Sequence, residues 1–300
     1  MSATRIIFGC GYLGLRVGSL WRDAGDEIIA ATRSEERAWE LRTKHGFRTL
    51  VVDVVDLFHA DLPRADTLLY AVGFDRNSGN SIHDVYAGGL QNVLATIPSN
   101  IRSAIYISTT GVYGTAGGGW VDETTPTDPQ RDGGKASLSA EEILAAHPLG
   151  QRSAILRLAG IYGPGRVPYL DKLRANEPIA APSEGWLNLI HVDDAARIVV
   201  AVDRWLAERE ANDGPHVFCV SDGSPVVRGD YYAEAARLIG APPPRFTMPP
   251  ADSPAAARAG ADRRVGNAKL RGLMSAAGIS LEYPSYHEGL ARILHTATAI

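Results

Sequence analysis

The sequence contains little cysteine and no surplus of positive charge. Its 300 residues include only Cys10 and Cys219, which could form at most one disulfide bridge and do not have the spacing of metal ligands. The formal net charge is −4 and the pI is near 6.1, so there is no basic excess of the kind that binds phosphate backbones. We therefore expect no metal site, a reducing compartment and no nucleic acid partner.

Long apolar runs are absent too. Runs such as residues 28–31 and 198–202 are far shorter than the roughly 20 residues that span a bilayer. The first residues, MSATRIIFGCG, do not have the pattern of a cleavable signal peptide. We therefore expect a cytoplasmic protein with no membrane partner.

The sequence does contain enough apolar residues for a large core, since 45% are hydrophobic and only 21% are charged. Short β-rich runs alternate with segments of helical periodicity, which is typical of βαβ units around a parallel sheet. The expected strands are residues 5–8, 27–31, 49–52, 67–72, 104–108 and 153–158, and the expected helices are residues 14–24, 35–45, 82–97 and 136–147. This order predicts an α/β fold with a doubly wound parallel sheet.

Proline and glycine become frequent after about residue 163. We therefore expect residues 1–165 to form a nucleotide-binding domain and residues 166–300 to form a smaller, discontinuous α+β substrate domain. Strand-like runs within 187–206 and 214–220 are expected to return to the main sheet. Residues 241–261 have no periodicity and are expected to form a long surface loop.

A glycine-rich motif follows the first expected strand. Residues 9–14 read GCGYLG, which fits G-x-G-x-x-G between a strand and a helix. Gly9 would permit the tight turn, Gly11 would let the backbone approach a pyrophosphate, and Gly14 would let helix and strand pack closely. Cys10 is interpreted as a small filler of this loop rather than a reactive thiol. The motif predicts a Rossmann-type dinucleotide site, the alternative being a turn that binds nothing.

The end of the second strand indicates which dinucleotide is bound. An NAD site usually has a carboxylate there, but residues 31–34 read ATRS. Arg33 and Ser34 instead offer a guanidinium and a hydroxyl to a 2′-phosphate, and Arg37 could add charge. We therefore predict NADP in preference to NAD, the alternative being that Arg33 is an ordinary solvated arginine.

Further cofactor contacts are expected at the ends of the other strands. Asp53 could accept from the adenine amino group, although an aspartate at a strand end is also a common cap. The complete predicted set of cofactor-binding residues is Gly9, Gly11, Tyr12, Leu13, Gly14, Arg33, Ser34, Arg37, Asp53, Val54, Ala71, Val72, Gly73, Ser108, Gly160 and Ile161.

Four stretches carry a resemblance to a known family. They are the YLG of the glycine loop, ISTTGVYG at residues 107–114, LRLAGIYGPG at residues 156–165 and IHVDD at residues 190–194. With them the chain resembles an extended short-chain dehydrogenase/reductase of the NAD(P)-dependent epimerase/dehydratase group, over nearly its whole length. The glycine loop departs from the family's G-x-x-G-x-x-G, because Phe8 stands where the first glycine would fall.

The resemblance implies an Asn-Ser-Tyr-Lys catalytic set, which this chain lacks in part. The serine position matches Thr109 and the asparagine position matches Tyr86. An ungapped count places Gly133 at the tyrosine position and Ser137 at the lysine position, and neither can transfer a proton as the family requires. The chain is thus expected to be an atypical member without the Tyr-x-x-x-Lys pair.

Other polar residues are weighed against simpler roles. Lys135 is interpreted as a solvated helix lysine, because a frame shifted to include it would put Arg131, a poor general acid, at the tyrosine position. Tyr113 either faces the substrate or is a structural aromatic, and His191 is interpreted as a core histidine. Two acidic pairs are interpreted as ordinary structural residues, a helix-capping pair at residues 193–194 and a surface-turn pair at residues 122–123.

Two functions follow from these expectations. The first is an atypical NADP-dependent oxidoreductase or epimerase acting on a small carbonyl or sugar-like substrate, with Thr109 and Tyr113 as catalytic residues. The second is a catalytically silent module that senses NADP or a ligand. We favour the enzyme, with a small-molecule substrate and a monomeric or homodimeric state.

Overall fold

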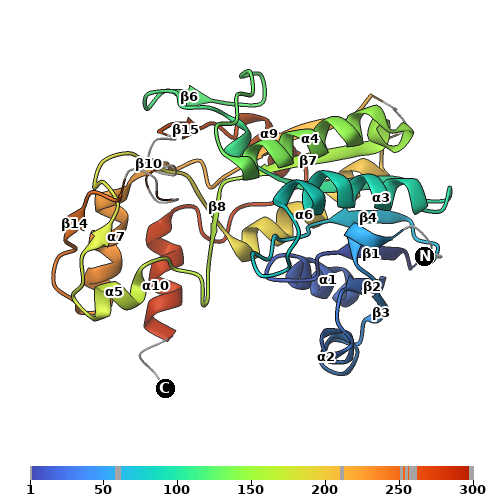
Figure 1. Ribbon diagram of the computed structural model, residues 1–300, viewed down its shortest axis with the longest axis horizontal. Helices are drawn as coiled ribbons and strands as arrows, with labels where there is room; N and C mark the ends of the chain where they lie inside the picture. Colours follow the sequence, from blue (N-terminus) through green and yellow to red (C-terminus); the bar gives the residue numbers. More distant parts are fainter. Residues whose placement is uncertain are drawn as a thin grey trace. The chain divides into compact units, whose positions relative to one another are not determined.

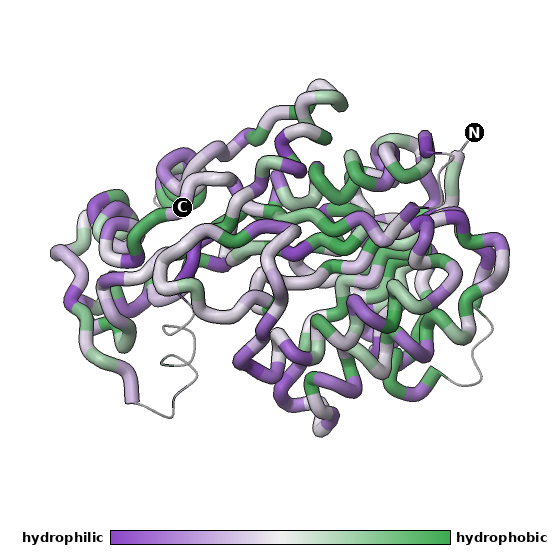
Figure 2. Tube along the Cα trace, turned by 90° about the horizontal axis from the view of Figure 1, so that it is seen from above, coloured by the Kyte–Doolittle hydropathy of each residue, from purple (hydrophilic) through white to green (hydrophobic). Residues whose placement is uncertain are grey.

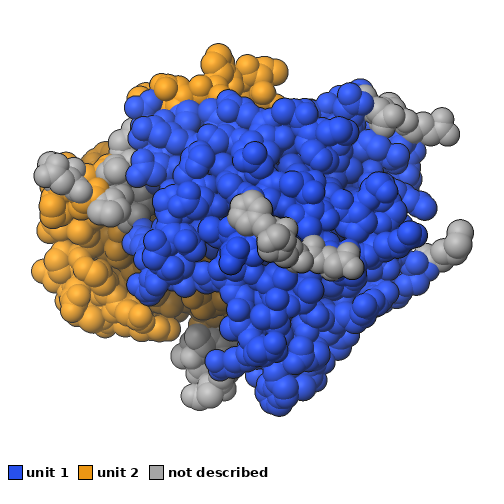
Figure 3. Space-filling view, turned by 45° about the vertical axis from the view of Figure 1, so that its right-hand side comes forward, with its two compact units in different colours: residues 1–112, 129–157, 195–218 blue, residues 113–128, 158–194, 219–300 orange. Residues whose placement is uncertain are grey.

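The computed structural model describes residues 2–57, 62–209, 213–250, 253, 256 and 262–296. Two compact units divide the chain, and they are coloured separately in Figure 3. Unit 1 comprises Met1–Val112, Pro129–Arg157 and Ala195–Phe218. Unit 2 comprises Tyr113–Asp128, Leu158–Asp194 and Cys219–Ile300. Each unit is therefore built from three separate stretches of sequence.

A seven-stranded sheet in the order β12-β7-β5-β4-β1-β2-β3 forms the centre of unit 1 (Figure 1). The pairs β1–β2, β1–β4, β2–β3 and β4–β5 are all parallel. Its strands are β1 Thr4–Phe8, β2 Glu27–Thr32, β3 Arg48–Val51, β4 Thr67–Tyr70, β5 Ser103–Thr109, β7 Ser153–Leu158 and β12 His216–Val220. The connecting helices are α1 Gly14–Asp23, α2 Glu35–His45, α3 Gly89–Thr96, α4 Asp132–Ala146 and α6 Val192–Ala207. This is the predicted Rossmann-type doubly wound fold.

The strands of unit 1 are apolar because helices cover the sheet on both faces. Ile6 and Phe8 of β1 and Leu68 of β4 are at most 1% exposed, and they belong to one apolar cluster that continues onto α3 and α4. Figure 2 colours the trace by hydropathy, and in it green, apolar segments lie close together while many purple, polar segments lie at the bends of the trace. This packing brings the carboxyl ends of the parallel strands together at one edge of the sheet.

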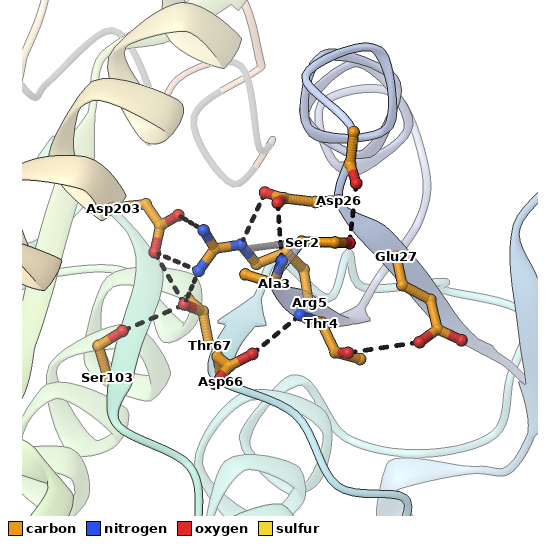
Figure 4. Close-up of polar contacts among 11 residues, drawn as sticks. Ser2, Ala3, Thr4, Arg5, Asp26, Glu27, Asp66, Thr67, Ser103 and Asp203 are labelled. Carbon is orange, nitrogen blue, oxygen red and sulfur yellow. Dashed lines mark hydrogen bonds and ion pairs between the residues drawn. The ribbon is translucent and has the colours of Figure 1, made fainter.

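The opposite edge of the sheet is tied by a buried ion pair (Figure 4). Nη2 of Arg5 lies 3.1 Å from Oδ2 of Asp203, and its Nε lies 3.2 Å from Asp26. Thr67 donates to Oδ1 of Asp203 at 2.8 Å and shares a hydrogen bond with Ser103 at 3.2 Å. Burial raises the pKa of Asp203, and the charge of Arg5 opposes that rise. The network joins β1, β4, β5 and α6.

Unit 2 consists of small sheets and short helices. Its pairs are β8–β11 and β9–β14, both parallel, β6–β15, also parallel, and β10–β13, antiparallel. The strands are β6 Trp120–Val121, β8 Gly160–Tyr162, β9 Ile179–Ala180, β10 Trp186–Leu187, β11 Leu189–His191, β13 Val226–Val227, β14 Phe246–Thr247 and β15 Arg264–Val265. The helices are α5 Leu170–Arg174, α7 Arg228–Leu238, α9 Ala268–Ala276 and α10 Tyr286–Thr296. Their core gathers around Ile179, Tyr231 and Leu290.

Some predicted elements differ from the structure. The strand-like run expected within residues 187–206 does not join the seven-stranded sheet, because β11 pairs with β8 instead. The run expected within 214–220 does join it, as β12. The expected strand at 67–72 ends at Tyr70. The expected surface loop at 241–261 contains β14, which pairs with β9, and much of its remainder lies outside the described residues.

The expected helix at residues 82–97 is also interrupted. It begins with a π-helical turn at Asp84–Gly88, labelled η2, and continues as α3. The hydroxyl of Tyr70 donates to the carbonyl of Val85 at 2.7 Å, so a side chain from the sheet satisfies a carbonyl inside this turn. Such π turns are frequent at functional sites.

Candidate nucleotide-binding site

The glycine loop follows β1 at the carboxyl edge of the sheet. Gly9 has φ +92°, and a Cβ there would overlap the carbonyl oxygen of Ala71, which follows β4. A Cβ at Gly14 would overlap the carbonyl of Gly9, which confirms the expected close approach of helix and strand. Both positions therefore require glycine for reasons internal to the protein.

Gly11 differs from these two glycines. A Cβ at Gly11 would have no atom of the described chain within 4 Å, and its φ is not positive. Packing inside the protein does not explain a glycine here, whereas the approach of a pyrophosphate to the backbone at the start of α1 would. The loop thus fits a dinucleotide.

The remaining residues of the loop have structural contacts. Leu13 is 7% exposed, and Tyr12 stacks against the guanidinium of Arg16, 4.5 Å from the ring centre. Cys10 is buried, and burial raises the pKa of its thiol to about 12. Cys10 therefore remains a thiol at neutral pH and is a filler, as expected.

Two arginines follow β2 at the same edge. Arg33 lies 3.2 Å from Oδ2 of Asp75, which belongs to the loop after β4. Arg37 donates to the carbonyl of Cys10 at 3.1 Å and pairs with Glu40. Arg37 therefore touches the glycine loop, while Arg33 has a carboxylate partner that the sequence did not suggest.

Ser34 and Asp53 act as caps in this structure. Ser34 accepts from the backbone N–H of Arg37 at 3.2 Å and begins α2. Asp53 accepts from the N–H of Val55 at 3.0 Å and begins a 3-10 turn, labelled η1, at Val54–Asp56. The capping alternative for Asp53 is therefore the one that the structure shows, and Val54 is 7% exposed.

The loop after β4 lies beside the glycine loop. The N–H of Ala71 donates to the carbonyl of Phe8 at 2.7 Å, which extends the β1–β4 pairing one residue past the end of β4. Val72 packs against the core of unit 1. A Cβ at Gly73 would meet nothing within 4 Å. The described chain therefore leaves space beside Gly73.

Ser108 takes part in a buried charge network. Its hydroxyl donates to Oε1 of Glu141 at 2.5 Å, and Arg157 donates to both oxygens of Glu141 at 3.1 and 2.6 Å. All three residues are at most 7% exposed. The network ties α4 to β5 and β7, so the hydroxyl of Ser108 is engaged inside unit 1.

Thr109 ends β5 and is only partly buried. Its Oγ1 accepts from the N–H of Gly111 at 3.0 Å, a contact that fixes the oxygen without using the hydroxyl proton. Nη2 of Arg131 also approaches this turn, since it lies 3.4 Å from the position of a Cβ on Gly111. Thr109 thus presents a hydroxyl that can donate.

The two positions that the ungapped count assigns to the family's tyrosine and lysine both lie on α4. Gly133 is in the first turn, where a Cβ would make an ordinary contact of 3.4 Å with Ile82. Ser137 is 2% exposed and hydrogen-bonds the Tyr106 side chain. Burial raises the pKa of Tyr106, and its neighbour Tyr86 contributes to the rise. Lys135 on the same helix is exposed, as expected.

Residues 6–220 of the chain match the NAD dependent epimerase/dehydratase family. The chain belongs to this family. Protein YeeZ of Escherichia coli strain K12 is 32% identical over 251 residues, which cover 80% of this chain and 85% of the relative. A 3-diazoavenalumate denitrifying reductase of Streptomyces sp is 30% identical over 175 residues, or 53% of this chain and 52% of the relative.

Solved structures share the fold of this chain. A conserved protein of unknown function from Silicibacter pomeroyi DSS has 29% identity and a TM-score of 0.74, covering 99% of both chains. UDP-glucuronic acid 4-epimerase from Bacillus cereus, solved in complex with NAD, has 17% identity and a TM-score of 0.75, again over 99% of both chains. The second similarity concerns the fold alone.

Several family positions lie in unit 2. Tyr113 is 2% exposed, and its hydroxyl lies 3.2 Å from Sγ of Cys219, which favours the structural alternative for this tyrosine. Gly160 and Ile161 form β8 beside β11. His191 is 1% exposed and stacks on Tyr283 with ring centres 3.8 Å apart, as a core histidine does.

The acidic residues of unit 2 have roles that the sequence only partly suggested. The interpretation of Asp194 as a cap of its own helix is corrected, because its two oxygens accept from the N–H groups of Glu282 and Tyr283 at 2.8 Å each. Asp122 forms the expected turn with Thr124. Glu123 instead accepts from the N–H of Cys219 at 2.7 Å, across 96 residues.

The described residues include neither a metal-binding cluster nor a membrane-spanning helix. No group of three or more His, Cys, Asp or Glu side chains there could hold a metal ion. None of the helices in those same parts of the chain has the length and apolar character needed to cross a membrane.

Proposed function

We propose that the chain binds an NAD(P) cofactor at the glycine loop and acts as an atypical NADP-dependent oxidoreductase or epimerase on a small carbonyl or sugar-like substrate. The observation that carries the proposal is the contrast among the loop glycines. Gly9 and Gly14 are required by contacts within the protein, whereas Gly11 faces open space. No contact within the described chain requires a glycine at position 11. A phosphate group that approaches the backbone at the start of α1 would require one.

Different residues of the chain would contact different parts of the dinucleotide. The backbone at Gly11 would face the pyrophosphate, and Gly73 would leave room for a ribose. Arg33 would donate to a 2′-phosphate, which favours NADP by charge-assisted hydrogen bonds. The bound nicotinamide would supply hydride transfer. Ser108 and Tyr113 are not retained as ligand contacts, because their hydroxyls are engaged in the interior.

Thr109 is the residue that we assign to the substrate. Its hydroxyl oxygen is held by the N–H of Gly111, so its proton can be donated to a carbonyl oxygen. No phenol and ammonium pair stands at Gly133 and Ser137 to transfer a proton. Because a positioned acid contributes about 10²- to 10⁴-fold, reduction of simple carbonyls should be slow. The Streptomyces relative, named as a reductase, supports the enzyme.

The alternative is a silent module that binds NADP without turnover, and the packing of α4 favours it. Ser137 is buried against Tyr106, so this position serves the core. Turnover of NADPH with a library of small carbonyl compounds separates the two functions. Thr109→Ala should abolish any activity found, and complete absence of turnover with tight NADPH binding would support the sensor.

The binding proposal is tested at Gly11. The Gly11→Val variant should fold as the parent does, since a Cβ at this position meets no described atom within 4 Å. It should lose NADPH and NADH, because the added side chain would take the space of the pyrophosphate. Gly272→Val is a matched control, because that glycine also faces open space, on α9. Retained nucleotide fluorescence changes in folded Gly11→Val would refute the site.

A further inference from the structure

The ion pair between Arg33 and Asp75 lies across the glycine loop. Arg33 follows β2 and Asp75 follows β4, and the sheet order places β1 between those two strands. The glycine loop leaves the end of β1 and touches the end of β4 where Gly9 meets Ala71. The pair of charges therefore joins the two loops that flank the start of α1.

The carboxylate of Asp75 is held in place by its own turn. Its Oδ1 accepts from the N–H of Asn77 at 2.9 Å, and Ser78 donates through Oγ to the carbonyl of Asp75 at 2.8 Å. Oδ2 is the oxygen that faces Arg33, at 3.2 Å. The hydrogen bond from Asn77, and then Arg33, lower the pKa of Asp75, so the group is ionised at neutral pH.

Both members of the pair remain accessible. The side chain of Arg33 is 47% exposed and that of Asp75 is 46% exposed. An ion pair this open to water is weak, so a ligand that offers Arg33 a phosphate can displace Asp75. The neighbouring Arg37 is already engaged with Cys10 and Glu40.

We propose that Asp75 is a cofactor-selectivity residue: its carboxylate takes the place of the acidic residue missing from the end of β2, accepts from the adenosine ribose of NAD, and competes with the 2′-phosphate of NADP for Arg33. This inference rests on the proposed nucleotide site. The carboxylate of Asp75 would make the preference for NADP over NAD smaller than Arg33 alone would give.

The size of the effect follows from the charges. A 2′-phosphate carries a charge near −2, and a carboxylate that shares the same arginine lies on the order of 6 Å from it. In high dielectric this repulsion corresponds to about 10-fold in affinity, less after screening by salt. We therefore expect Asp75→Asn to raise the ratio of NADP to NAD affinity by about 3- to 10-fold. The ribose of NAD would also bind less well, because the neutral amide oxygen of asparagine is a weaker acceptor than a carboxylate.

The test is calorimetric titration of the full chain with NADP⁺ and with NAD⁺ at low and at high salt. The control variant is Asp23→Asn. Asp23 is the last residue of α1, far from the glycine loop, and pairs with Arg22 at 2.7 Å, so this variant removes the same charge from another exposed ion pair. Asp75→Asn should bind NADP⁺ more tightly and NAD⁺ less tightly, and the gain for NADP⁺ should shrink at high salt. Asp23→Asn should leave the ratio unchanged.

Two failures can be told apart. If the parent chain binds both nucleotides and the two variants change the ratio equally, Asp75 is not a selectivity residue, although the nucleotide site stands. If the parent binds neither NAD⁺ nor NADP⁺, the nucleotide site itself is refuted, and the inference with it.

Discussion

Replacing Asp222 by asparagine is expected to stabilise the protein above neutral pH. Asp222 lies at the end of β12, inside unit 2, and is 7% exposed. Its Oδ1 accepts from the N–H of Ser224 at 2.8 Å, whereas its Oδ2 has no hydrogen-bond partner among the described residues. Burial, reinforced by the charges of Asp194 and Glu288, raises the pKa of Asp222 to about 7.

The sign of the effect follows from linkage. The folded chain holds the proton of Asp222 more tightly than the unfolded chain, whose carboxyl has the ordinary pKa of 3.8. Its contribution is therefore most favourable below about pH 4, is lost as the pH rises toward 7, and changes no further above that. At about 1.4 kcal/mol per tenfold change in acidity, the loss reaches at most about 4 kcal/mol, of which roughly 2–3 kcal/mol falls between pH 5 and pH 8.

Urea unfolding followed by tryptophan fluorescence at pH 5, 6, 7 and 8 measures this loss. The stability of Asp222→Asn should exceed that of the parent by an amount that grows with pH and levels off near pH 8. Asp171→Asn is the matched control, because the Asp171 side chain of α5 is 96% exposed. Parallel stability curves for Asp222→Asn and the parent would refute the reasoning, since the buried carboxyl would then titrate alike in both states.

Two further predictions concern unit 1. Asp203→Ala should lower the free energy of unfolding, measured in urea, by about 3 kcal/mol, because the partly buried guanidinium of Arg5 loses one of its partners. Asp23→Ala, at an exposed ion pair, should change the free energy of unfolding by under about 1 kcal/mol. Equal losses in the two variants would contradict a stabilising role for the Arg5–Asp203 pair. Gly134→Ala should lower the melting temperature, because its Cβ would overlap a carbonyl of the turn after β5. Gly133→Ala, the control on the same helix, should be neutral or stabilising by up to about 1 kcal/mol. If thermal unfolding gave the reverse order, α4 would pack differently from the structure.

The elements that could be predicted from the sequence are those with local signals. The glycine loop was predicted because strand, turn and helix occupy consecutive residues, from β1 through α1. The start of α2 at Ser34 and its end at Gly46, with φ 67°, likewise depend on neighbours only a few residues away. The parallel direction of the central strands could be predicted from the alternation of strands and helices.

Contacts between distant residues could not be predicted in the same way. Asp75 reaches Arg33 across 42 residues, and Glu123 reaches the backbone of Cys219 across 96. Both are acidic residues in polar turns, so their sequence neighbours are those of any solvated loop. The residues at the end of β2 include no carboxylate, and only the fold brings Asp75 to Arg33.

The residues around Gly133 and Ser137, the positions assigned to the family's tyrosine and lysine, have packing roles on helix α4. Gly134 lies against the turn that follows β5, and Ser137 is sealed against Tyr106. Glu141, one turn further on, holds Ser108 and Arg157 in a buried network. A lysine at position 137 would put an ammonium group where 2% of the side chain is exposed and where its contact is a tyrosine hydroxyl whose pKa burial already raises. Burial disfavours both charged forms, so a serine suits position 137 better than a lysine. Under the proposed function, α4 contributes packing and the acid used in catalysis comes from another element.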